Sequence, residues 1–365
     1  MGTWNIHLEA PLQECEQRAA LLARIGQAGG HVAFVGTHIA WITVEMERNP
    51  AEVLAGMRGI VDLETDGACM QATTVAADRD LNWAATMVDA AMAHEVTRGA
   101  GATITVLDTG LGQHPDLDGA RIMVGPDMVP NERGQDLHGH GTAIMGLLVA
   151  QGRDYIGIAP EANIMMVKVL DRHGKGLWSW IAAGIEKALD ANSDVVVMAL
   201  GGHEHSLMVA DAMRALASSG AIAVVAAGND GSRQLDFPGA SPFAITVAAV
   251  DRNGRVPRFS SWAPWPEGPD VAAPGVQVQT LARHGGYSTM SGTSLACAVA
   301  GGCLALLYSV ERSIRSLHNT TPGKDVAVVE VRRRLRDLSI PLAGPNRAGY
   351  GLINANNLVR DRRMR

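Results

Sequence analysis

The 365-residue chain is poor in cysteine. Its four cysteines (Cys15, Cys69, Cys297 and Cys303) are widely scattered and form no Cys-x-x-Cys pair. Such scatter argues against a zinc or disulfide-exchange motif. Free thiols in a reducing compartment are therefore expected.

The chain also lacks a strong excess of charge and long apolar runs. Its formal charge of −6 offers no general attraction for nucleic acid or an anionic membrane. No apolar run reaches about 18 residues without polar interruption, so no membrane span is expected. The first 14 residues lack both the basic and the apolar region of a signal peptide, so a cytoplasmic protein is expected.

What the chain does have is glycine and apolar residues. Its 41 glycines and 47% hydrophobic content exclude a disordered chain and a coiled coil. The glycine excess indicates many tight turns, as in a loop-rich α/β enzyme. The length allows one large domain with a small one, or two of middling size.

The chain divides near residue 76. Residues 4–67 read strand, helix, two strands, helix, strand, which predicts a small α+β domain of the ferredoxin-like, split βαβ kind over residues 1–76. Residues 68–80 have no clear period and are interpreted as a linker. Beyond them, short apolar runs alternate with amphipathic helices, which predicts a parallel sheet covered by helices. Its functional site should lie at the carboxyl ends of the strands.

The expected elements have the following bounds. In the small domain we expect strands at 4–9 and 60–64, a hairpin over 31–45, and helices at 12–28 and 50–57. In the large domain we expect buried strands at 102–107, 163–170, 194–200, 221–226 and 244–250.

Three short motifs fall at such strand and helix ends. Asp108 ends an apolar strand in Asp-Thr-Gly, His140 opens an apolar helix in His-Gly-Thr, and Ser294 opens another in Gly-Thr-Ser. Together they supply a hydroxyl, a base to take its proton, and an acid to orient the base. The chain order Asp, His, Ser is the one found in subtilisin.

Simpler interpretations of these motifs explain less. Aspartic proteases use Asp-Thr-Gly in pairs so that two carboxylates share a proton, but this chain has one copy. Ser294 could be a helix N-cap alone, and Asn229 a plain turn residue. Neither role accounts for the sequence around it.

Residues of about 82–357 resemble the catalytic domain of subtilisin-like serine peptidases. The stretches that carry the resemblance are VLDTGLGQHPDL (106–117), HGHGTAIMGLL (138–148), IGIAPEANIMMVKVL (156–170), VVVMALGG (195–202), VVAAGNDG (224–231), FPGASPFAITVAAVD (237–251), FSSW (259–262), DVAAPG (270–275), SGTSLA (291–296) and GYGLINA (349–355). The resemblance implies a three-layer α/β peptidase domain over residues 77–365, with a parallel sheet at its centre.

The resemblance also implies roles for single residues. Asp108 would orient the base, His140 would be the general base and acid, and Ser294 the nucleophile. Asn229 resembles the family's oxyanion-hole asparagine, which acts together with the Ser294 backbone N–H. No cofactor is required for this chemistry.

A further set of residues resembles the family's substrate-binding segments. Two edges would pair with an extended peptide, the S1 pocket would lie between two walls with an acid near its mouth, and two side chains would line S4. The edges are Gly174, Lys175, Gly176 and Leu200, Gly201, Gly202; the S1 walls are Leu200, Gly201 and Ala226, Ala227, Gly228, with Asp230; S4 is lined by Trp178 and Ile181.

Some features depart from the family pattern. Asp116 matches one family calcium ligand, but the loop QGRDY (151–155) is short, so a structural calcium ion is a candidate with few ligands. The loop after Asn229 is also short. Asp230 and Asp236 in it would favour a basic P1 residue, unless Arg233 cancels them. The histidines around 138–140 and 203–205 lack the spacing of a zinc site.

By position and topology, residues 1–76 resemble the family's inhibitory propeptide, whose end runs through the active-site cleft. The resemblance implies an intramolecular inhibitor and self-cleavage within about 69–77. A retained regulatory domain is the alternative.

The function expected is that of a serine endopeptidase, acting on extended peptide or protein substrates through an acyl-enzyme. The alternatives are a dedicated cytoplasmic protease that processes leader peptides or propeptides, and a non-catalytic peptide-binding module on the same fold.

Overall fold

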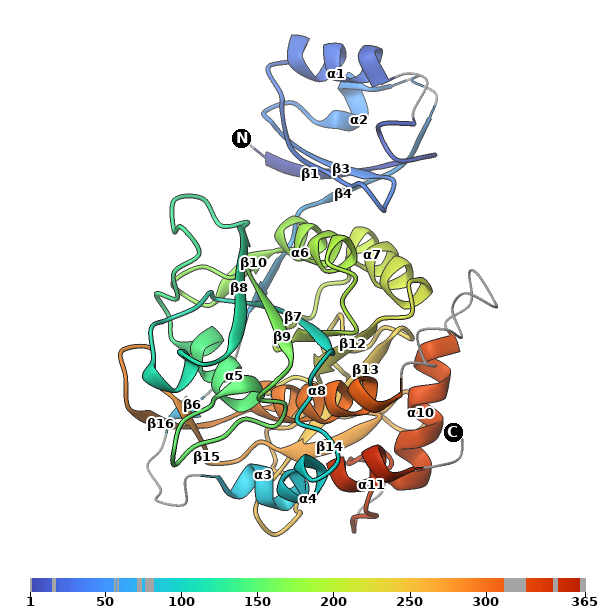
Figure 1. The fold of residues 1–365 in the computed structure, drawn as a ribbon. Helices are drawn as coiled ribbons and strands as arrows, with labels where there is room; N and C mark the ends of the chain where they lie inside the picture. The colour runs from blue at the N-terminus through green and yellow to red at the C-terminus, as the bar shows by residue number, and fades with distance from the viewer. Residues whose placement is uncertain are drawn as a thin grey trace.

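A computed structural model describes residues 2–14, 18–55, 57, 59–70, 74–75, 82–311, 326–343 and 347–361. A small N-terminal unit sits on the helices of a larger one, and an extended segment joins the two (Figure 1). The termini of the chain lie on different units.

The N-terminal unit is a four-stranded antiparallel sheet with helices on one side (Figure 1). Its sheet order is β2-β3-β1-β4, the split βαβ arrangement that the sequence predicts. Ile6, Leu21, Ile25 and Val44 are almost fully buried and form its core. Its elements are β1 (Gly2–Leu8), α1 (Arg18–Gln27), β2 (His31–Val35), β3 (Trp41–Met46), α2 (Pro50–Val53) and β4 (Ile60–Thr65).

Both helices of this unit are shorter than expected. The first was predicted from Leu12, but residues 12–14 form a turn in which the Glu14 N–H donates to the Pro11 carbonyl (2.8 Å). The second ends at Val53 rather than Met57. Leu54 caps it, with its N–H bonded to the Pro50 carbonyl.

The larger unit is built on a seven-stranded sheet in the order β14-β13-β12-β11-β7-β9-β8. Every neighbouring pair is parallel, which confirms the prediction from the apolar runs. The strands are β7 (Thr103–Asp108), β8 (Arg121–Asp127), β9 (Asn163–Lys168), β11 (Val195–Met198), β12 (Ile222–Ala226), β13 (Ala244–Val250) and β14 (Val271–Pro274).

Helices cover both faces of this sheet and complete three layers (Figure 1). On one face lie α5 (His140–Val149) and α8 (Thr293–Val310), and on the other α6 (Trp178–Asp190) and α7 (Leu207–Ser218). Alternate residues of β11 serve the two cores: Val195 and Val197 face α8, whereas Val196 and Met198 face α6 and α7. This explains why the strands are apolar along their whole length.

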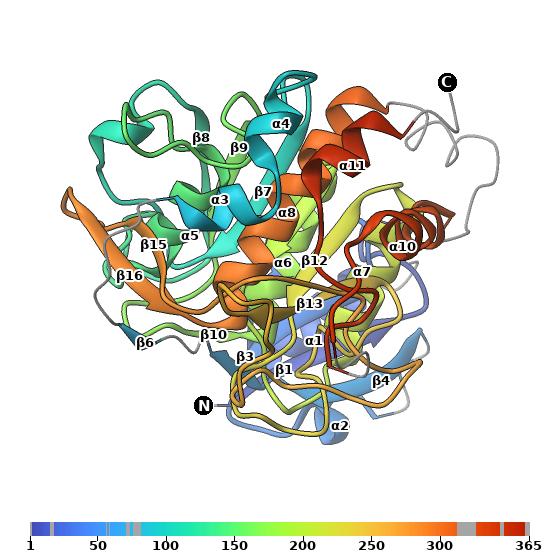
Figure 2. The ribbon, with the colours of Figure 1, turned by 90° about the horizontal axis from the view of Figure 1, so that it is seen from below.

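Shorter elements complete the larger unit. Four further helices lie at one side of the larger unit (Figure 2): α11 (Ala355–Arg360) packs on α8 and on α4 (Ala90–His94), α3 (Trp83–Met87) packs on α4, and α10 (Val326–Leu338) contacts α11 and α7. The remainder are η1 (Pro115–Leu117), β10 (Lys175–Leu177), β15 (Val278–Leu281) and β16 (Tyr287–Ser291).

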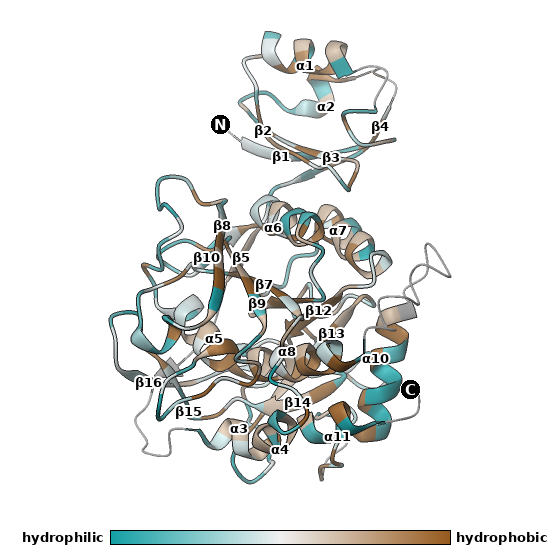
Figure 3. Ribbon diagram, viewed as in Figure 1, coloured by the Kyte–Doolittle hydropathy of each residue, from teal (hydrophilic) through white to brown (hydrophobic). Residues whose placement is uncertain are grey.

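Helix α8 is apolar on nearly all sides and runs through the interior (Figure 3). By length and composition it is the one helix among the described residues that could cross a membrane. Of its 18 residues, 89% are buried inside the protein. A buried core helix passes the same test, so this is weak support for a span.

The segment predicted as a linker, residues 68–80, contains two short strands. These are β5 (Ala68–Met70) and β6 (Thr74–Val75). Strand β5 pairs with β10 and β6 with β16, both antiparallel. Partners far along the chain create these strands, so no local period marks them. Residues 71–73 and 76–80 lie outside the described residues.

Candidate active site

Asp108 and His140 form a buried pair at the carboxyl edge of the sheet. Asp108 is the last residue of β7, and His140 is the first of α5. His140 Nδ1 lies 2.7 Å from Asp108 Oδ1 and 2.9 Å from Oδ2, and neither side chain is exposed. A carboxylate on Nδ1 holds the proton there and leaves Nε2 as the ring's acceptor.

Ser294 lies at the same edge of the sheet. It is the second residue of α8, and its hydroxyl donates to the carbonyl of Ala199, just after β11 (3.1 Å). Strand β11 is the direct neighbour of β7, which ends at Asp108. Within the described part of the chain, His140 Nε2 has no hydrogen-bond partner. The bond between base and hydroxyl is therefore not made here, and such bonds commonly tighten only with bound substrate.

The Asn229 side chain is held in one orientation beside Ser294. Its Oδ1 accepts hydrogen bonds from the Thr293 backbone N–H (2.7 Å) and the Thr293 hydroxyl (3.1 Å). The amide nitrogen therefore points the other way, and Asn229 and Ser294 line one small pocket. An amide donor beside the start of a helix can stabilise a negative oxygen.

Asp136, which was not among the residues expected at the site, connects these elements. Its carboxylate accepts from the Thr109 hydroxyl (2.9 Å), next to Asp108, and from the Gly139 and Thr142 backbone N–H groups (2.6 and 2.9 Å), on either side of His140. Burial alone would raise the pKa of Asp136, but these hydrogen bonds and that of the Thr142 hydroxyl outweigh it, so the pKa lies below its usual value. The signal in the sequence that could have indicated Asp136 is its position, four residues before His140.

A close backbone contact fixes β7 against α5. A Cβ atom on Gly141 would lie 2.2 Å from the carbonyl oxygen of Gly110, and Gly110 has a φ of +107°. The Gly141 N–H donates to the Thr109 hydroxyl (2.8 Å). Glycine at 110 and 141 therefore allows the approach that joins Asp108 to His140.

The chain's own strand β5 lies between the two predicted substrate-binding edges. On one side Met70, Cys69 and Ala68 pair with Lys175, Gly176 and Leu177. On the other, Met70 exchanges both backbone hydrogen bonds with Gly201 (3.0 and 3.2 Å). Gly174 is in the turn before β10 and Gly202 bonds to Phe237, so these two do not pair with β5. The pairing of β5 with both edges is thus made by backbone hydrogen bonds, as for an extended peptide.

The two residues predicted to line S4 surround a side chain of β5. Trp178 and Ile181 are buried in one apolar cluster with Cys69. A Cβ atom on Gly176 would lie 3.3 Å from the Cys69 sulfur. The Trp178 backbone N–H also donates to the Gly67 carbonyl (3.0 Å). This apolar cluster can accept a small apolar side chain.

The pocket beside Ser294 is small, with a cavity volume of about 20 Å³ while Met70 of β5 lines it. It contains two of the predicted S1 residues on one side, Leu200 and Gly201, and two on the other, Ala226 and Gly228; Ala199, which adjoins Leu200, also lines it. Ala227 is fully buried, and Asp230 does not line the pocket. Asp236, the other loop carboxylate expected to favour a basic P1 residue, does line it, as do Met70, Asn229 and Thr293.

Asp116, the candidate calcium ligand, is hydrogen-bonded to protein. Its Oδ2 accepts from the Tyr287 hydroxyl (2.8 Å), and its carbonyl accepts from the Gln151 N–H (2.7 Å). A Cβ atom on Gly152 would lie 2.3 Å from its carboxyl carbon. Calcium at this position stays a prediction.

Three carboxylates attach the N-terminal unit to the larger one. Glu186 of α6 accepts the backbone N–H groups of residues 37–39 (2.7, 2.9 and 3.0 Å). Glu64 accepts from the Ser206 hydroxyl (2.7 Å) and the Leu207 N–H (2.8 Å) at the start of α7. Asp66 accepts from the Ser179 N–H (2.9 Å) at the start of α6. Carboxylates at helix N-termini are favourably placed.

The three described cysteines, Cys69, Cys297 and Cys303, are free and buried, as expected; Cys15 lies outside the described residues. Burial raises the pKa of Cys297 far above its usual value, and its Sγ lies 3.2 Å from the Val224 carbonyl oxygen. Cys297 is therefore an unreactive core residue of α8.

Comparison with known proteins gives a consistent result. Residues 99–341 match the model of the subtilase family. The chain is 33% identical over 281 residues to a protein named intracellular serine protease from Paenibacillus polymyxa, covering 73% of this chain and 83% of that one. It is 34% identical over 282 residues to subtilisin BL from Lederbergia lenta (76% and 98%), and 32% identical over 323 residues to an alkaline protease from Shouchella clausii (87% and 79%).

The family match spans most of the chain, and its relatives at this identity are serine proteases. The parallel sheet between two helical layers is the fold that the resemblance implied. The chain therefore belongs to the subtilase family and is a serine endopeptidase.

Proposed function

We propose that Asp108, His140 and Ser294 are the catalytic triad of this endopeptidase. The Ser294 hydroxyl leaves the Ala199 carbonyl, gives its proton to His140 Nε2 and attacks the peptide carbonyl carbon. Asp108 holds the imidazole and stabilises its positive charge. The support is the 2.7 Å contact of Asp108 with His140 Nδ1, which leaves Nε2 to act as base.

The oxyanion of the tetrahedral intermediate would bind between Asn229 and the Ser294 backbone N–H. Collapse of the intermediate expels the amine, which takes its proton from His140, and leaves an acyl-enzyme on Ser294. Water then repeats the sequence with His140 as base. The orientation of Asn229 by Thr293 supports this role.

We further propose that residues 1–76 form an intramolecular inhibitor. The observation that supports it is β5, which occupies both substrate-binding edges as a peptide substrate would. The contacts of Glu64, Asp66 and Glu186 hold the N-terminal unit against α6 and α7, and so keep β5 in place. A substrate must displace β5 before it can bind.

The proposed self-cleavage falls between Met70 and Thr74. Met70 is paired with Gly201 on one side of the site, and Thr74 is paired with Ser291, three residues before Ser294, on the other. Only the peptide bonds from 70 to 74 run between these two anchors. The cut is therefore proposed between residues 70 and 74, within the predicted window of 69–77. Residues 71–73 lie outside the described residues.

The test is to express the wild type, Ser294→Ala and the control Ser219→Ala, and to measure intact masses. We expect the wild type and the control to separate into two fragments cut between residues 70 and 74. Ser294→Ala should keep the full-length mass. If all three stay at full length, self-cleavage is wrong; if Ser294→Ala is also cut, another protease makes the cut.

We also propose that the protein acts in the cytoplasm. One relative is named an intracellular serine protease, and the described cysteines are free thiols. Fractionation of the source cells with an antibody to the chain would test this. Recovery in the culture medium would contradict it.

A further inference from the structure

Among the described residues that line the pocket beside Ser294, Asp236 alone has an ionisable side chain. The other lining residues are apolar, glycine, amide or hydroxyl residues. A single carboxylate in such a pocket will discriminate strongly between charged and neutral side chains, because little else there can solvate a charge.

The backbone around Asp236 joins the two walls of the pocket. The Asp236 N–H donates to the Ala227 carbonyl (3.1 Å) in one wall, and Phe237 exchanges two hydrogen bonds with Gly202 (2.8 and 2.9 Å) beside the other. The side chain lies between the walls themselves. A Cβ atom on Gly228 would lie 2.7 Å from its carboxyl carbon, and one on Gly201 would lie 3.0 Å from its Cβ.

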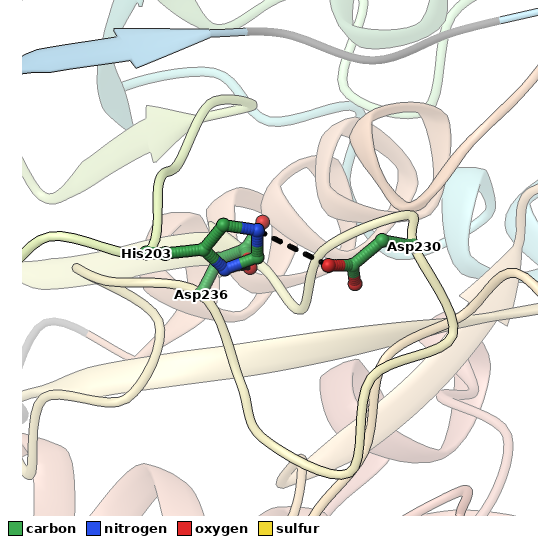
Figure 4. A group of neighbouring side chains, drawn as sticks. All are labelled: His203, Asp230 and Asp236. Atoms are coloured by element: carbon green, nitrogen blue, oxygen red, sulfur yellow. Dashed lines mark ion pairs between the residues drawn. The ribbon is translucent and has the colours of Figure 1, made fainter.

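Asp236 has negative charge nearby and is poorly neutralised. Asp230 lies beside it, and His203, whose side chain is 75% exposed, bridges the two: Nε2 is 3.2 Å from Asp230 Oδ2, and Nδ1 is 3.4 Å from Asp236 Oδ1 (Figure 4). The Asp236 Oδ1 atom is buried and has no hydrogen bond within the described chain. Burial first, and Asp230 second, raise the pKa of Asp236 to about 6.

Arg233, the only cation of this loop that the sequence set against Asp230 and Asp236, points elsewhere. Its guanidinium lies over the ring of Trp262, 5.5 Å from the centroid. No ion pair joins it to Asp230 or Asp236 in the part of the chain that the structure describes.

We propose that Asp236 is the specificity-determining residue of the pocket and selects substrates with lysine or arginine at P1, the residue before the cleaved bond. The inference rests on the proposed role of Ser294, since the pocket is defined by its position beside that hydroxyl. The ammonium or guanidinium group would bind the buried Asp236 oxygen, with His203 displaced from it.

The chain's own cleft segment cannot supply this cation. Residues 69–77 read CMQATTVAA and contain no lysine or arginine. A substrate with a basic P1 residue would therefore make an ion pair that the inhibitor segment lacks. Such substrates should displace β5 more readily than neutral ones.

The test uses two peptidyl diphenyl phosphonates that differ only at P1. One carries lysine, and the other norleucine, which has a similar chain without the ammonium group. The rate of Ser294 modification is followed by intact mass, which distinguishes the full chain from the fragment that carries Ser294 after self-cleavage, so no turnover is needed. EDTA is added because the ligand atoms of His203, Asp230 and Asp236 lie within 4.8 Å of one another and could hold a metal ion.

We expect the lysine reagent to react faster by about 10- to 100-fold, as for a charged hydrogen bond in a partly buried site. In Asp236→Asn this ratio should fall toward one, and in the control Asp118→Asn, an exposed carboxylate, it should stay as in the wild type. The readout is the ratio of the two modification rates, so a substitution that slows both reagents equally leaves it unchanged.

Equal or faster reaction of the norleucine reagent with the wild type would overturn the inference and leave the proposed function standing. So would a ratio unchanged in Asp236→Asn. If a simple fluorophosphonate modifies Ser294 but neither peptide reagent does, the pocket admits neither side chain and the inference is wrong. If even the fluorophosphonate fails, the proposed function itself is wrong.

Discussion

Glu186 offers a direct way to weaken the proposed inhibitor without touching the triad. Its side chain is buried between the two units, and it accepts the backbone N–H groups of Thr37, His38 and Ile39, as well as the Thr37 hydroxyl. Replacing it by alanine removes the common acceptor of this loop. The N-terminal sheet should then separate from α6 more often, and β5 should leave the substrate-binding edges with it.

The magnitude follows from these contacts. A hydrogen bond to a charged group contributes about 1.5–3 kcal/mol, and the contributions of bonds to one carboxylate are not additive. Water can also reach the freed N–H groups once the loop detaches. We therefore expect Glu186→Ala to weaken docking by roughly 3 kcal/mol, which corresponds to about a 100-fold shift in the closed–open equilibrium.

The assay is the rate at which a fluorophosphonate modifies Ser294 in the uncleaved chain, whose intact mass distinguishes it from molecules already cut between residues 70 and 74. Glu186→Ala should react up to about 100-fold faster than the wild type, and Glu186→Gln, which keeps an acceptor but no charge, should lie between them. Glu161→Ala, which removes a partly exposed carboxylate paired with Arg98, is the control and should react like the wild type. An unchanged rate in Glu186→Ala would refute the idea that this contact restrains the site.

Further outcomes follow from the same structure. Asn229→Ala should lower kcat by about 10²–10³-fold with a much smaller change in KM, and an equal loss in KM would contradict its proposed oxyanion role. Asp136→Ala should lower both kcat and Tm, because several buried donors lose their acceptor, and Asp136→Asn should recover part of the loss in kcat and in Tm. A wild-type kcat in both variants would contradict the positioning role of Asp136. The pKa of Asp236 is raised to about 6, with Asp230 and His203 facing it, so its negative charge is present above pH 6 and lost below. The ratio of the modification rates with the lysine and norleucine reagents should therefore fall between pH 8 and pH 5, and a constant ratio would contradict this. Cys297 should resist N-ethylmaleimide in the native protein and react after denaturation, as peptide mapping would show; rapid native labelling would contradict its burial.

Much of the fold follows from local sequence signals. The strands that become β7, β9 and β13 are apolar on both faces, which distinguishes a covered parallel sheet from a half-exposed antiparallel one. The motifs that hold Asp108 and His140 fall where such a sheet brings strand ends together. Their pairing could therefore be anticipated before any coordinates.

Other features depend on partners distant in sequence. Strand β5 has three residues, and its pairing is supplied by β10 and Gly201, more than 100 residues away. The cluster of His203, Asp230 and Asp236 exists because Gly202 and Phe237 are hydrogen-bonded to each other. No periodicity within residues 68–80 or 229–238 encodes these contacts.

The central claim is that Ser294 is a nucleophile activated by His140. Modification of the native protein by a fluorophosphonate, with the modified residue located by peptide mapping, tests it most directly. We expect a single modification at Ser294, lost in Ser294→Ala and strongly slowed in His140→Ala. A folded wild-type protein that remains unmodified, or that is modified at another residue, would contradict the proposed triad.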